Sequence, residues 1–236
     1  MINMSTLKLK AAIAVVLFLF MAEGSFAVTR FYMPSTGTAE VAPTFEATWS
    51  NLTMVKRIRC TTTRFNTTMV TETSPSITTG NCLFRQYVSD PLTADQTFAG
   101  WVRGQIMGLA SSSAAKCDSS FAARIVSNDG TIVRGILLAY TSEASPANDY
   151  PTTLTNRAAP SQRNINTVNA LYGDRVVIEI GTNSNNPSAK TSSQVFGDNG
   201  STDLPVNQTG VDATLNPWVE FGDKDLSINQ SVMIIE

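Results

Sequence analysis

The sequence predicts an all-β fold, an antiparallel β-sandwich of jelly-roll type. From Arg30 onward, helical periodicity never persists for three turns, whereas short apolar or alternating runs recur between clusters of turn-forming residues. Hydrophobic residues make up 42% of the chain and charged residues 15%. This balance is typical of a globular β protein and not of a disordered or coiled-coil chain.

The first residues have the features of a secretory signal peptide. Lys8 and Lys10 precede an apolar run over residues 11–21, and Ser25 and Ala27 supply the small side chains that signal peptidase requires. The run is far shorter than the roughly 20 residues that a membrane-spanning helix needs. The sequence therefore predicts export, to the extracellular space or to the surface of a particle.

The domain organisation follows from this leader. Residues 1–27 are predicted to be the signal peptide and residues 28–236 a single β-sandwich domain, which is long enough for one sizeable core. Translation from Met21 is an alternative that would leave the chain without a leader. N-terminal sequencing distinguishes the two.

The strands are predicted where β-prone runs stand between turn residues. In chain order they are Arg30–Met33, Met54–Cys60, Thr67–Glu72, Cys82–Val88, Thr97–Met107, Phe121–Val126, Ile132–Tyr140, Asn166–Leu171, Arg175–Ile180, Gln194–Phe196, Trp218–Phe221 and Leu226–Ile228.

Two elements stand out locally. The segment from Phe121 to Tyr140 is predicted to be a hairpin, because Asn-Asp-Gly at 128–130 tolerates positive φ between two β-prone runs. The strand at 175–180 alternates, which predicts a core-facing side and an opposite side. Val176, Ile178 and Ile180 share one face, and Val177 and Glu179 share the other. The Ser/Thr/Asn/Pro-rich stretches Thr141–Asn164 and Thr182–Ser193 are predicted to be loops and the most ligand-facing regions.

The absence of histidine removes several kinds of catalysis. Ser-His-Asp and Cys-His catalysis and His-ligated zinc are all excluded, since the chain has no histidine. Paired carboxylates remain, with Glu179, Glu220 and Asp223 as candidates for a carboxylate-dependent glycan hydrolase. Glu179 and Glu220 are more simply outward-facing strand residues. We therefore expect a protein that is not an enzyme and assign no catalytic residue.

Four aromatic residues are candidates for ligand binding. Trp101 and Trp218 lie within apolar strands, where core packing is favoured over a sugar-stacking platform. Trp49 and Tyr150 lie in polar segments and are expected to be exposed. These aromatics and the Asx-rich loops suggest a carbohydrate-binding module of an exported adhesin as an alternative function.

The charged residues suggest one candidate metal site and give no sign of a nucleic-acid partner. Asp198, Asn199 and Asp203 form a loop cluster whose oxygens can hold calcium, although Asx-rich turns occur more often without it. A second pair, Asp223 and Asp225, follows later. No other cofactor is expected. The net charge is −2 and the basic residues are scattered, so nucleic acid is not an expected partner.

Cysteines and asparagines are candidates for covalent modification. Three cysteines allow at most one intramolecular disulfide, and the sequence leaves open both the pairing and whether any bridge forms. Asn-x-Ser/Thr occurs about as often as chance predicts in so polar a chain. The cysteines are Cys60, Cys82 and Cys117, and the possible glycosylation sites are Asn51, Asn66, Asn199, Asn207 and Asn229.

An ordered series of motifs covers roughly Val28 to Phe221. It comprises Thr29-Arg-Phe-Tyr-Met-Pro-Ser, Leu83-Phe-Arg-Gln-Tyr-Val-Ser-Asp-Pro-Leu, Gly130-Thr-Ile-Val-Arg-Gly-Ile-Leu-Leu-Ala, Thr153-Leu-Thr-Asn-Arg, Gly173-Asp-Arg-Val-Val-Ile-Glu-Ile-Gly, Thr202-Asp-Leu-Pro and Asn216-Pro-Trp-Val-Glu-Phe. Together they resemble small virion-associated proteins of tailed-phage and environmental sequences. The resemblance implies a β-sandwich displayed on a particle or fibre, with no catalytic residue. The leading expectation is a structural or display protein whose partners are copies of itself or other surface or virion proteins. Glycans are a further candidate partner. No stable membrane span is expected after the signal peptide is cleaved.

Overall fold

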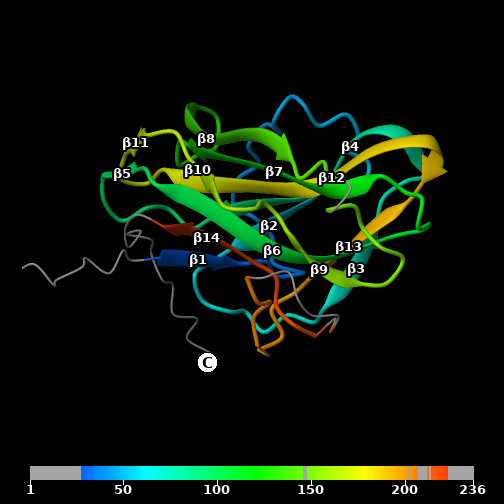
Figure 1. Cartoon of the computed structure of the whole chain (residues 1–236). Coiled ribbons are helices and arrows are strands. Elements are labelled where there is room, and N and C mark those ends of the chain that lie inside the picture. The colour runs from blue at the N-terminus through cyan, green and yellow to red at the C-terminus, as the bar shows by residue number, and fades with distance from the viewer. Residues whose placement is uncertain (1–27, 146–147, 201, 207–211, 213, 223–236) are drawn as a thin grey trace, which may run out of the picture.

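The protein is a two-layered β structure (Figure 1). The computed structural model describes residues 28–145, 148–200, 202–206, 212 and 214–222. These residues form strands, turns and loops and contain no α-helix. A search of the same residues finds no helix with the length and apolar character needed to cross a membrane.

The first layer is a five-stranded sheet with the order β2-β4-β12-β7-β8. Its pairs are antiparallel except β2 with β4, which are parallel. The strands are β2 (Lys56–Cys60), β4 (Ile77–Ser89), β7 (Cys117–Val126), β8 (Val133–Ser142) and β12 (Arg175–Lys190).

The second layer is a seven-stranded antiparallel sheet. Its path is β1-β14-β6-β13-β3, and β9 and β10 also pair with β6. Its strands are β1 (Val28–Tyr32), β3 (Val70–Thr73), β6 (Trp101–Ala110), β9 (Thr155–Ala158), β10 (Arg163–Asn164), β13 (Ser192–Phe196) and β14 (Trp218–Gly222). A small separate sheet pairs β5 (Gln96–Phe98) with β11 (Val168–Ala170).

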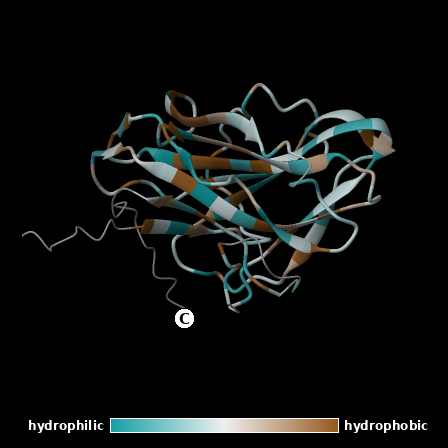
Figure 2. Ribbon diagram, viewed as in Figure 1, coloured by the Kyte–Doolittle hydropathy of each residue, from teal (hydrophilic) through white to brown (hydrophobic). Residues whose placement is uncertain are grey.

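The main hydrophobic core lies between the two layers. Ile178 of β12 and Phe121 of β7 belong to the same buried cluster as Val219 and Phe221 of β14. Strand alternation explains this, because every second side chain points into the sandwich. Figure 2 shows the alternation of hydrophobic and hydrophilic residues along the long strands. The prediction of an all-β, antiparallel-rich sandwich is confirmed.

The predicted strands agree with the structure in position, with three corrections. Each one predicted between Arg30 and Phe221 overlaps an observed strand. Thr97–Met107 is two strands, β5 and β6, because the chain turns at Gly100 with a φ of 84°. The predicted loop Thr141–Asn164 contains β9 and β10, and the predicted loop Thr182–Ser193 is mostly the second half of β12 and the start of β13.

Some predictions fall outside the described residues. These are the signal peptide at 1–27 and the strand Leu226–Ile228. The single domain over 28–236 stays a prediction.

Candidate functional site

The best candidate for a contact surface is a groove on the outer face of the five-stranded sheet. It has a volume of about 270 Å³ and lies between β8 and the loop at 44–47, with β7 beneath. Its wall on β8 is apolar, and its floor is formed by residues 122–124 of β7, where Ala122 and Arg124 alternate with the core residue Ala123. The groove therefore combines an apolar rim with a charged group at its base.

A buried carboxylate below the groove positions the covering loop. Glu179 of β12 is fully buried, and its Oε1 lies 3.0 Å from Nη2 of Arg124. Glu179 also accepts hydrogen bonds from Trp49 Nε1 at 2.8 Å, from Gln86 Nε2 at 2.8 Å and from the backbone N–H of Glu46 at 3.1 Å. A buried charge is tolerated when it is paired and hydrogen-bonded in this way. Glu179 thus attaches the 46–49 segment to the sheet.

The rim of the groove exposes large apolar side chains on β8. Val133 is 53% exposed and Ile136 is 47% exposed, and the adjacent Ile132 is 55% exposed. Strand β8 ends the five-stranded sheet, and Asn166 occupies part of its free edge by hydrogen bonds to the carbonyl oxygens of Ile136 and Leu137. Contiguous exposed apolar side chains at a sheet edge are typical of contact surfaces.

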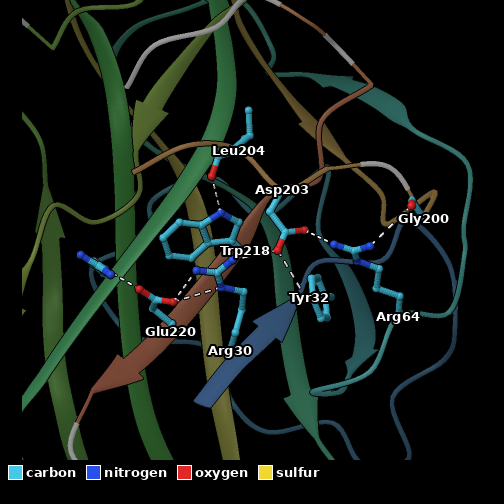
Figure 3. A network of polar contacts seen from close by, with 9 residues as sticks. Arg30, Tyr32, Arg64, Gly200, Asp203, Leu204, Trp218 and Glu220 are labelled. Carbon is cyan, nitrogen blue, oxygen red and sulfur yellow. Dashed lines mark hydrogen bonds and ion pairs between the residues drawn. The ribbon is translucent and has the colours of Figure 1, made fainter. Parts of the chain in front are cut away.

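The outer face of the other sheet carries a second charge network (Figure 3). Glu220 of β14 is buried and accepts from Arg30 at 2.6 Å and from Arg103 at 2.5 Å. Arg30 also pairs with Asp203 at 2.8 Å and stacks over the ring of Trp218 at 4.0 Å. These contacts join β1, β6 and β14 to the segment around Asp203.

The two predicted carboxylates that the structure describes, Glu179 and Glu220, do not form a catalytic pair. Glu179 and Glu220 alternate with the core residues Ile178 and Val219 on different sheets, so they project from opposite outer faces of the sandwich. Each is surrounded by its own donors. Asp223 lies outside the described residues. This arrangement lacks the facing carboxyl groups, roughly 5–10 Å apart, that glycan hydrolysis needs.

The aromatic residues predicted to be exposed are buried instead. Trp49 is 5% and Tyr150 2% exposed, so that expectation is wrong. Trp49 turns inward because its indole N–H donates to Glu179, and Tyr150 because its hydroxyl bonds to Ser119 and Gln194. Trp218 is fully buried, as favoured, in a second apolar cluster with Met107 and Leu204 on the outer face of the seven-stranded sheet, and its indole N–H donates to the Leu204 carbonyl.

Trp101 is half-buried. Its ring packs so closely on Gly222 that a Cβ there would lie 2.1 Å away, and Arg103 covers it at 4.8 Å. None of the four rings is therefore an open stacking platform.

The loop carboxylates of the predicted calcium cluster bind protein donors. Asp198 accepts from the backbone N–H groups of Phe65 and Thr67, each at 2.6 Å. Asp203 pairs with Arg30 and Arg64, and Asn199 is exposed. In the described part of the chain, no group of three His, Cys, Asp or Glu residues is placed to hold a metal ion. Calcium binding stays a prediction.

The cysteines and asparagines lie as follows. Cys60, Cys82 and Cys117 are buried free thiols. Asn66 and Asn199 are exposed, and Asn51 is half-buried. Asn207 and Asn229 lie outside the described residues.

Sequence reasoning missed a polar pocket of about 290 Å³ at one end of the five-stranded sheet. Asp118 of β7 lies in its wall, and burial raises the pKa of this carboxyl to about 7, with the negative charges of Asp149 and Glu143 adding to the effect. A signal was present in the sequence, because Cys-Asp-Ser-Ser opens a strand that is otherwise apolar. An acidic side chain in such a strand needs a partner or a ligand.

Comparisons with known proteins give only distant likenesses. No family model and no curated protein matches the chain. Among solved structures, an α-amino acid ester hydrolase is 12% identical with a TM-score of 0.43, covering 85% of this chain and 36% of its own. A CocE/NonD family hydrolase from Staphylococcus aureus is 10% identical with a TM-score of 0.29, covering 85% and 35%. The VP2 subviral particle of infectious bursal disease virus is 12% identical with a TM-score of 0.24, covering 67% and 35%. This chain thus spans about a third of the length of each, and no activity follows from these likenesses.

Proposed function

We propose that this protein is a non-enzymatic structural or display protein, a subunit of an extracellular surface assembly or virion. Its partners are copies of itself or other proteins of the same surface. The motif resemblance to virion-associated proteins supports the role, and the predicted signal peptide supports a location outside the cell.

The observation that carries the proposal is the apolar rim of the groove on β8. Val133 and Ile136 are each about half exposed beside a groove that is open to solvent. Burying this surface against a neighbouring subunit would contribute about 25 cal/mol for each Å² of apolar area removed from water. The groove is lined in part by Arg124, whose buried ion pair with Glu179 lies below it, and a surface supported in this way favours a defined contact.

The state of the carboxylates supports the non-enzymatic part of the proposal. A general acid or base must be free to exchange a proton with substrate. Glu179 and Glu220 instead lie buried under arginine side chains on opposite faces. The chain also has no histidine, the side chain that most often transfers protons near neutral pH.

The test is the assembly state of the purified protein. Sedimentation velocity over a wide concentration range, with negative-stain electron microscopy, should show oligomers or particles. Val133→Glu should shift the population toward monomer. Leu52→Glu, which changes another exposed apolar residue at 43% exposure, should not. A monomer at every concentration, or equal effects of the two variants, would contradict the proposal.

A further inference from the structure

A polar pocket lies between the start of β7, the residues Ala144, Ser145 and Asp149, and the second half of β12. Its volume is about 290 Å³, far more than one metal ion occupies. The polar side chains that line it are Lys116, Asp118, Ser145, Asp149, Asn183 and Asn185. This pocket is separate from the groove on β8, and the inference below does not rest on the proposed assembly role.

The buried carboxylate of Asp118 is incompletely satisfied. The residue is 3% exposed, and its Oδ1 has no hydrogen-bond partner. An unpaired carboxylate oxygen is costly in a protein interior. The other buried strand carboxylates, Glu72, Glu179 and Glu220, each have arginine partners. Asp118 differs from them in being part of a pocket wall.

The charges around Asp118 do not compensate it. The negative charges of Asp149 and Glu143 both raise its pKa, and the one hydrogen bond that opposes this effect comes from the backbone N–H of Glu143. Lys116 is exposed at the rim and acts on Asp149, but no ion pair joins it to Asp118. The pocket thus presents acceptors at its base and donors at its edge, since Lys116, Ser145 and the Asn185 amide can all donate.

We infer that this pocket binds a polyhydroxylated ligand, one saccharide unit of a glycan. Sugar hydroxyl groups donate and accept at once, so a pair of them can donate to the acidic side chains of the wall, Asp118 and Asp149, and accept from the donors at the rim. A bare cation would use only the acceptors and would be repelled by Lys116. Among the described residues no three acidic or sulfur ligands are placed around a metal position.

The experiment is a titration of the isotopically labelled protein with D-mannose, D-galactose, D-glucose and N-acetyl-D-glucosamine, each separately. At least one sugar should shift the backbone amide signals of Asn183 and Asn185 in a saturable way. Above pH 7, where the Asp118 carboxyl is ionised, Asp118→Asn should weaken that binding roughly tenfold, because a charge-assisted hydrogen bond becomes a neutral one. Asn185→Ala, at an exposed rim position, should weaken it without affecting the fold. Asp95→Asn, which changes an exposed carboxylate on another loop, should leave it unchanged.

Several results would overturn the inference. One is that none of the four sugars moves these signals. Another is that Asp118→Asn binds as the unmodified protein does while its melting temperature shows that it is folded. A third is that calcium chloride alone produces the shifts, since the pocket would then be a cation site.

Discussion

Glu179 and Arg124 form a buried ion pair 3.0 Å long on the outer face of the five-stranded sheet. Strand β12 supplies the carboxylate and β7 the guanidinium; Arg124 pairs with Val177 and Glu179 with Ala122, so the two charged residues are diagonal neighbours on one face of the sheet. Removing the charge of Glu179 would leave Arg124 buried without compensation.

Glu179→Gln should therefore lower the free energy of unfolding by about 3 kcal/mol. Urea unfolding followed by circular dichroism measures it. Glu40→Gln is the matched control, because Glu40 pairs with Arg175 but its side chain is 55% exposed, so its loss should be below about 1 kcal/mol. Similar losses of unfolding free energy for both variants would mean that the buried Glu179–Arg124 pair stabilises the fold no more than an exposed ion pair does.

The second half of β12 shows why sequence reasoning failed where it did. Thr182, Ser184 and Asn186 are buried and alternate with more exposed neighbours, as in any strand. Their polar side chains are satisfied by β7, for example Thr182 Oγ1 by the Asp118 carbonyl and Ser184 Oγ by Cys117 Sγ. Hydropathy cannot reveal such alternation, so the segment resembled a loop. By contrast, the sequence showed that Val176, Ile178 and Ile180 share one face, because apolar residues recur at every second position there. This face lies in the core.

The site was less predictable than the fold. Trp49 lies in a polar segment, and its burial depends on Glu179, 130 residues away. One sequence contains no signal for a donor and acceptor so far apart. The outward direction of Glu179 and Glu220 was predictable from strand alternation. The arginine side chains and loop segments that cover these two carboxylates were not predictable.

Tyr150→Phe tests the burial of a residue that was expected to be exposed. Its hydroxyl lies 2.7 Å from both Ser119 Oγ and Gln194 Nε2, and its ring packs on Gly108, where a Cβ would lie 2.6 Å away. Losing the hydroxyl should cost about 1–2 kcal/mol of unfolding free energy. Tyr172→Phe, at 74% exposure, should change it by less than about 0.5 kcal/mol. Thermal and urea unfolding should agree on this order, and a reversed order would place Tyr150 at the surface.

The three cysteines should behave as buried free thiols. Burial raises the pKa of Cys82 to about 11 and raises that of Cys60 as well, so little reactive thiolate forms near neutral pH. Ellman's reagent should react slowly with the native protein. In concentrated guanidinium chloride without reductant it should titrate all three thiols. A count of one in denaturant, rising to three after reduction, would reveal a disulfide.

Asp118 should make stability depend on pH. The ordinary pKa of an aspartate is 3.8, and burial, together with Asp149 and Glu143, raises that of Asp118 to about 7 in the folded protein. Between these two values the folded state holds a proton that the unfolded state has released, so this contribution to stability is complete below about pH 4 and is lost as the pH rises through 7.

Asp118→Asn removes the titration. Relative to this variant, the unmodified protein should lose on the order of 2–3 kcal/mol between about pH 5 and pH 8 in urea unfolding. Asp95→Asn should keep the unmodified profile, whereas parallel profiles for the Asp118→Asn variant and the unmodified protein would show that the carboxyl titrates normally. A sugar that donates hydrogen bonds to the carboxylate should lower its pKa, so saturating sugar should move the loss of stability to lower pH while raising stability overall.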